Sequence, residues 1–123
     1  FIGITTPLIC YFFVSFVKSR LGYDDSLDAF GCHGMGGVWG ALMTGIFCTK
    51  TINDAGADGL LYGNPGQLIP QITGIVTGII VAIVMTTLII KVLGIFMKVR
   101  ATASEEAQGL DLIDHGERAY NKL

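Results

Sequence analysis

Three long apolar stretches, separated by polar segments, dominate this chain and predict three membrane-spanning helices. The apolar stretches are residues 1–17, 29–48 and 68–97, and a helix of about 20 apolar residues is long enough to cross the hydrocarbon core of a bilayer. The third stretch exceeds that length and has Lys91 as its only charged residue, so we expect it to tilt or to project from the bilayer. The pattern therefore predicts an all-α integral membrane protein.

The polar segments indicate how the chain is oriented. A turn covers residues 18–28, a longer loop covers residues 49–67, and a polar tail covers residues 99–123 after the membrane region 1–98. Basic residues follow the first and the third apolar stretch, namely Lys18, Arg20, Lys98 and Arg100. Because basic residues favour the cytoplasmic side, they orient this predicted multi-pass membrane protein. The turn and the tail would then be cytoplasmic and the loop external.

His33 is the most informative residue in the second apolar stretch, which contains no Lys, Arg, Asp or Glu. Helical periodicity places His33 on a face of small residues, with bulky residues such as Trp39 opposite; the small face holds Ala29, His33, Gly36, Gly37, Gly40, Ala41, Thr44 and Cys48. Small faces let membrane helices pack closely, so we expect the three glycines to contact neighbouring helices. An ionisable ring inside a membrane usually faces a bundle interior or a pathway. The alternative is a packing histidine bonded to a backbone carbonyl.

Composition narrows the function classes. Hydrophobic residues make up 51% of the chain and charged residues 15%, with a formal net charge of −2, which is typical of a membrane protein rather than a soluble domain. No basic patch supports nucleic-acid binding. The three cysteines form no CxxC pair, and adjacent residues such as Cys32 and His33 point about 100° apart on a helix. We therefore predict no metal site, and we separately expect no cofactor and no enzymatic activity.

Two longer motifs carry a family resemblance. Residues 24–37 (DDSLDAFGCHGMGG) resemble the signature that enters the penultimate helix of the ammonium transporter family (Amt/Mep). Residues 109–120 (GLDLIDHGERAY) resemble the cytoplasmic C-terminal motif of the same family. The resemblance covers essentially the whole chain and implies the last three helices and the tail of an eleven-helix, inverted-repeat fold. The chain also begins inside an apolar stretch without Met, so we expect further N-terminal helices in the same protein.

The resemblance implies a protein of the plasma membrane that forms a homotrimer with one hydrophobic pore per subunit. His33 matches the second of two pore histidines whose partner lies on another helix, and Ala29 would line the lower pore. Ammonium would give up its proton, ammonia would pass, and the histidines would relay the proton, so that potassium is excluded. The alternative is an ammonium sensor that uses the same pore. No output domain follows the tail motif in this chain, which favours transport.

Three aspartates, Asp24, Asp25 and Asp28, precede the His33 stretch. Carboxylates at the start of a helix accept hydrogen bonds from its free N–H groups and favour its positive end, so we expect at least one of them to cap the helix. The resemblance additionally implies that Asp28 lies near the inner pore mouth, where it could contact the tail.

The tail is predicted to be regulatory. Thr102 and Glu105 fit a capping box and predict a short helix. The family resemblance implies that the tail packs on the cytoplasmic faces of its own and a neighbouring subunit and that a PII signal protein is a candidate partner. The residues concerned are Gly109, Leu110, Asp111, His115, Gly116, Glu117 and Tyr120. A solvated, partly ordered tail is the alternative. Ile113 occupies the position of a regulatory threonine in plant members, so that phosphorylation switch is not expected.

Overall fold

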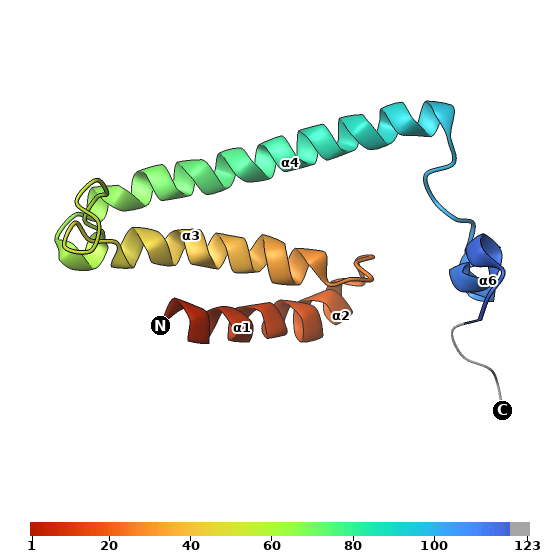
Figure 1. Ribbon diagram of the computed structural model, residues 1–123, viewed down its shortest axis with the longest axis horizontal. Coiled ribbons are helices and arrows are strands. Elements are labelled where there is room, and N and C mark those ends of the chain that lie inside the picture. The colour runs from red at the N-terminus through yellow and green to blue at the C-terminus, as the bar shows by residue number, and fades with distance from the viewer. Residues whose placement is uncertain (119–123) are drawn as a thin grey trace. The chain divides into compact units, whose positions relative to one another are not determined.

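The computed structural model describes residues 1–118, and these residues contain helices and turns without a β-strand. The chain divides into two compact units, Phe1–Ile80 and Val81–Leu123, and the boundary falls inside α4. The α-helices are α1 (Ile2–Phe12), α2 (Lys18–Leu21), α3 (Gly36–Phe47), α4 (Leu68–Phe96), α5 (Ala103–Gln108) and α6 (Leu110–His115) (Figure 1). The all-helical architecture predicted from the apolar pattern is confirmed for the described residues.

The first helical stretch runs from α1 through α2, and the second runs from Ala29 through α3. A π-helical turn interrupts each of them. One turn, Phe13–Val17, joins α1 to α2, and the other, Phe30–Met35, leads into α3. A π-helix closes its hydrogen bonds over five residues rather than four, and such turns are often found at functional sites. His33 lies inside the second π-helical turn.

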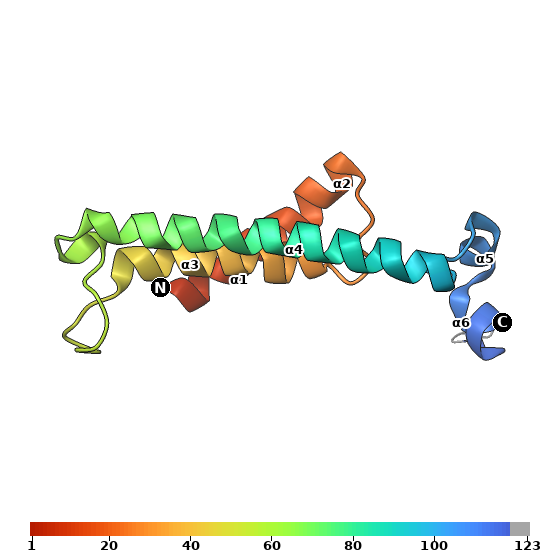
Figure 2. The ribbon, with the colours of Figure 1, turned by 90° about the horizontal axis from the view of Figure 1, so that it is seen from above.

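In the first unit, α1 and α3 lie side by side (Figures 1 and 2). The indole Nε1–H of Trp39 donates a hydrogen bond to the Thr5 hydroxyl over 2.9 Å, and the rings of Phe1 and Phe47 are 5.1 Å apart. Trp39 was expected on the face opposite the small residues, yet it contacts α1. The side of the second helical stretch that meets α1 is therefore not the uniformly small face that α-helical periodicity predicts.

The loop between α3 and α4 is held by Asp58. Its Oδ1 accepts hydrogen bonds from the Lys50 backbone N–H (2.8 Å) and the Thr49 hydroxyl (3.1 Å), and the Lys50 hydrogen bond is the main cause of a lowered pKa of the Asp58 carboxyl. Gly59 follows, and a Cβ there would lie 2.6 Å from the Gly45 carbonyl oxygen. The loop therefore returns tightly against the end of α3.

Within residues 1–118, two helical stretches are long and apolar enough to cross a membrane, Ile2–Leu21 and Pro65–Phe96. The stretch through α3 contains His33 and several glycines, which lower its mean hydropathy. Met43, 7% exposed, is the one buried apolar side chain of the described residues, and many large apolar side chains are exposed. Apolar surface of this extent is typical of contact with lipid or with other protein.

Candidate functional site

His33 lies on the side of its helix that the other described helices leave exposed. Ala29, the other predicted pore residue, is exposed as well, whereas Gly31 between them is buried. Two positions along a helix correspond to roughly half a turn, so Gly31 and His33 point to opposite sides. The arrangement fixes one side of the helix against protein and leaves the imidazole on the other. The role of both residues in a pore stays a prediction.

The predicted packing glycines differ in their surroundings. A Cβ on Gly36 would lie 3.1 Å from the Cys10 sulfur and 3.5 Å from Thr6 Cγ2, so Gly36 lies against α1. At Gly37 and Gly40, by contrast, a Cβ would meet no atom of the described residues within 4 Å. Helix packing at Gly37 and Gly40 therefore stays a prediction.

Gly31 is a contact residue that sequence reasoning missed. Its Cβ position lies 2.6 Å from Val14 Cγ2 and 3.3 Å from the Val14 backbone nitrogen. The signal in the sequence was the spacing of five between Gly31 and Gly36, which suits a π-helical turn. A search for α-helical spacing of three or four residues does not find this pair.

Asp25 caps the helix that carries His33. Its two carboxylate oxygens accept hydrogen bonds from the backbone N–H groups of Ala29 and Phe30, each over 2.9 Å. These N–H groups belong to the first turn of the helix and have no carbonyl partner within it. Asp25 thus fixes the start of the helix one turn before His33.

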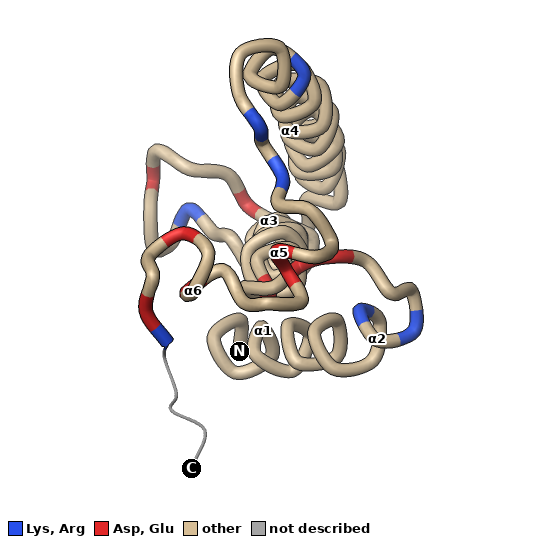
Figure 3. Tube along the Cα trace, turned by 90° about the vertical axis from the view of Figure 1, so that its right-hand side faces the viewer, with Lys and Arg blue, Asp and Glu red and all other residues tan. Residues whose placement is uncertain are grey.

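Lys18 joins the end of the first helical stretch to the same region. Its ammonium lies 2.6 Å from Asp28 Oδ1 and donates a second hydrogen bond, also 2.6 Å, to the Asp25 carbonyl oxygen. In Figure 3, blue segments (Lys and Arg) lie on α2, and a red segment (Asp and Glu) lies on the turn beside it. Asp28 has a φ of 55°, a conformation uncommon for residues other than glycine. Asp24 is exposed in the same turn, and a position of the three aspartates at a pore mouth stays a prediction.

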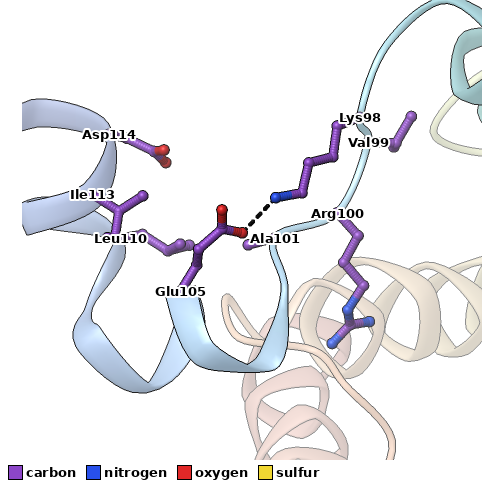
Figure 4. Close-up of a pocket in the computed structure, with 8 residues that line it drawn as sticks. All are labelled: Lys98, Val99, Arg100, Ala101, Glu105, Leu110, Ile113 and Asp114. Atoms are coloured by element: carbon purple, nitrogen blue, oxygen red, sulfur yellow. Dashed lines mark hydrogen bonds and ion pairs between the residues drawn. The ribbon is translucent and has the colours of Figure 1, made fainter.

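The tail forms a small folded region within the second unit. The capping box at Thr102 and Glu105 is confirmed, because the Thr102 side chain accepts from the Glu105 N–H and the Glu105 carboxylate accepts from the Thr102 N–H. The Glu105 carboxylate also lies 2.5 Å from the Lys98 ammonium. Lys98 and Glu105 line a cavity of about 300 Å³ together with apolar side chains of α6, Leu110 and Ile113 (Figure 4).

The remaining tail residues lie next to two glycines that have positive φ. Gly109 (98°) separates α5 from α6, and Gly116 (69°) ends α6. Leu110, Asp111 and His115 belong to α6, and the Glu117 N–H donates to the Asp111 carbonyl oxygen over 3.3 Å. Tyr120 lies outside the described residues. Regulation through these residues stays a prediction.

We expect the α5 cap to resist acid. The Lys98 hydrogen bond, with the Thr102 N–H second, lowers the pKa of Glu105 from 4.5 to about 2. A carboxyl whose pKa falls on folding stabilises the folded state above its unfolded pKa, and this contribution disappears as the pH falls through the folded pKa. Amide chemical shifts of Thr102 and Glu105 should therefore stay constant down to about pH 4 and change at lower pH, with a midpoint near pH 2. A Glu105→Gln variant should show no such transition; a wild-type transition centred near pH 4.5 would contradict the capped geometry.

The amino-acid sequence of this chain is similar to that of known proteins. Residues 1–120 match the sequence model of the Ammonium Transporter Family. The chain is 47% identical over 119 residues to an ammonium transporter of Bacillus subtilis and 43% identical over 121 residues to one of Aquifex aeolicus. It is 36% identical over 120 residues to ammonium transporter Amt1 of Archaeoglobus fulgidus. These alignments cover 97%, 98% and 97% of this chain but 30%, 28% and 30% of the relatives, so the chain spans less than a third of their length.

Proposed function

This chain belongs to the ammonium transporter family, and we propose that the protein transports ammonium across the plasma membrane through a hydrophobic pore that passes His33. The observation that carries the proposal is the placement of His33. The ring lies on the exposed side of a helix whose opposite side, at Gly31 and Gly36, is buried. An imidazole held in this way inside an otherwise uncharged membrane helix is suited to a pathway.

The chemistry of the ring supports proton removal from the substrate. Transfer of ammonium into an apolar lumen carries a large desolvation cost, whereas ammonia is neutral and carries a much smaller one. A neutral imidazole has one acceptor and one donor nitrogen. The acceptor nitrogen of His33 takes the proton of ammonium, ammonia passes, and the donor nitrogen hands a proton to a second histidine on another helix. Potassium has no proton to give up and is rejected.

We also propose the assembly in which this pore operates. Further helices of the same protein and two other copies of it cover the apolar surface that the described helices expose. The turn at residues 18–28 and the tail face the cytoplasm, where a PII signal protein is the candidate partner. Asp24, Asp25 and Asp28 surround the inner mouth of the pore in this arrangement.

Transport can be tested directly with the intact protein in proteoliposomes on a solid-supported membrane. An ammonium pulse should give a current or an internal pH change, and an equal potassium pulse should give neither. Binding of ammonium without either signal would contradict transport and would favour the sensor function.

The tail can be tested at Gly116. A β-branched residue is rarely found at positive φ, and a Cβ at Gly116 would meet no atom of residues 1–118 within 4 Å, so a substitution acts on the backbone rather than on packing. Gly116→Val should accelerate hydrogen exchange of the α6 amides. It should also change the ammonium current, because the tail would no longer dock on the cytoplasmic faces of the subunits. Gly116→Asn is the matched control, since Asn tolerates this conformation better. Random-coil exchange of residues 109–118 in the wild type, with no effect of Gly116→Val on the current, would leave only a solvated tail.

A further inference from the structure

The two π-helical turns pack against each other, and Gly31 and Val14 make a particularly close contact between them. Gly31 belongs to the turn Phe30–Met35 and Val14 to the turn Phe13–Val17. With a Cβ position 2.6 Å from Val14 Cγ2, no side chain larger than hydrogen fits at position 31 without movement. The rings of Phe13 and Phe30 pack edge to face beside this contact, with their centroids 6.3 Å apart.

The π-helical winding changes which residues face the first helical stretch. In a regular α-helix Gly31 and Gly36, five positions apart, would point about 140° away from each other. Here both are buried, Gly31 against Val14 and Gly36 against Cys10. His33 lies between these two anchors and is exposed on the other side. The orientation of the ring is therefore coupled to the winding of the turn between the two glycines.

We propose that Gly31 is a positioning residue for His33: its contact with Val14 holds the π-helical turn in the winding that presents the imidazole to the pore. Any side chain at position 31 must separate the two helices or rewind the turn. Rewinding a π turn into an α turn rotates the residues before it by about 100° relative to α3. The presence of a pore at His33 rests on the proposed function, but the orientation of the ring can be measured without it.

Solid-state NMR of the intact protein in lipid bilayers, with ¹⁵N-labelled histidine, tests the proposal. The ring signals of His33 are assigned by their loss in His33→Ala. Gly31→Ala should shift these signals and reduce the ammonium current about tenfold or more, in the range expected when a reacting group moves by about 1 Å. Gly31→Ala combined with Val14→Ala should restore both. Gly3→Ala is the matched control, because a Cβ on Gly3 in α1 would meet no atom of another element within 4 Å among the described residues, and it should leave the ring signals unchanged.

The contact between Gly31 and Val14 can also be tested by a substitution at Val14. Val14→Ile adds a methyl group towards Gly31 and should shift the ring signals in the same way, which keeps the test decisive if Gly31→Ala does not fold. Unchanged ring signals in folded Gly31→Ala protein would overturn the proposal, and so would shifted signals that Val14→Ala does not restore. A shifted ring with unchanged transport would support the positioning role and contradict the pore assignment.

Discussion

Replacing His33 with Ala is expected to reduce the ammonium-evoked current at least about tenfold, equivalent to a barrier higher by about 1.4 kcal/mol or more. The methyl group of Ala provides neither a proton acceptor nor a donor, so ammonium would have to cross the apolar lumen with its charge. The protein should still assemble, because His33 is exposed in the described chain and Gly31 and Gly36 make the contacts with the first helical stretch.

His33→Glu is the informative companion variant. A fixed carboxylate favours bare cations, so this variant should conduct and should also pass potassium. Currents for ammonium and potassium, measured on a solid-supported membrane with equal amounts of assembled protein, separate a loss of ammonium transport from a loss of selectivity. An unchanged ammonium current and unchanged selectivity in His33→Ala would remove His33 from the mechanism.

Asp25→Ala is expected to destabilise the start of the His33 helix. The substitution removes both side-chain hydrogen bonds to the N–H groups of Ala29 and Phe30, and loss of a helix cap costs about 1–2 kcal/mol. Hydrogen exchange of these two amides should accelerate by a factor of about 5–30, which corresponds to that free energy. The Lys18 hydrogen bond to the Asp25 backbone carbonyl is retained in this variant.

Asp25→Asn is the control for this effect. The amide retains one acceptor oxygen and loses the charge, so the exchange rates should fall between those of the wild type and Asp25→Ala. Equal rates in all three proteins would show that the carboxylate does not hold the helix start.

The features that the sequence predicted are those that depend on local chemistry. The apolar stretches form helices because a helix satisfies its own backbone hydrogen bonds in an apolar surrounding. Thr102 and Glu105 close a capping box because both partners lie within one helical turn. Asp25 caps the His33 helix because its carboxylate lies beside the free N–H groups of the first turn.

The features that were not predicted depend on contacts between helices. An α-helical wheel assumes 3.6 residues per turn, and the π-helical turn at Phe30–Met35 breaks this assumption. As a result Gly31 contacts the first helical stretch. Trp39, in the regular helix α3, contacts it as well, although neither residue belonged to the predicted packing face. The Lys18–Asp28 ion pair joins residues ten apart in the chain, across a turn whose geometry the sequence pattern does not specify.

The most direct test of the central claim is an experimental structure of the intact protein in lipid. Our account predicts that the His33 ring lies inside the helical bundle, on the side of its helix opposite Gly31, with one ring nitrogen within hydrogen-bond distance of a second histidine. A structure in which the ring faces lipid, or has no histidine beside it, would contradict the account.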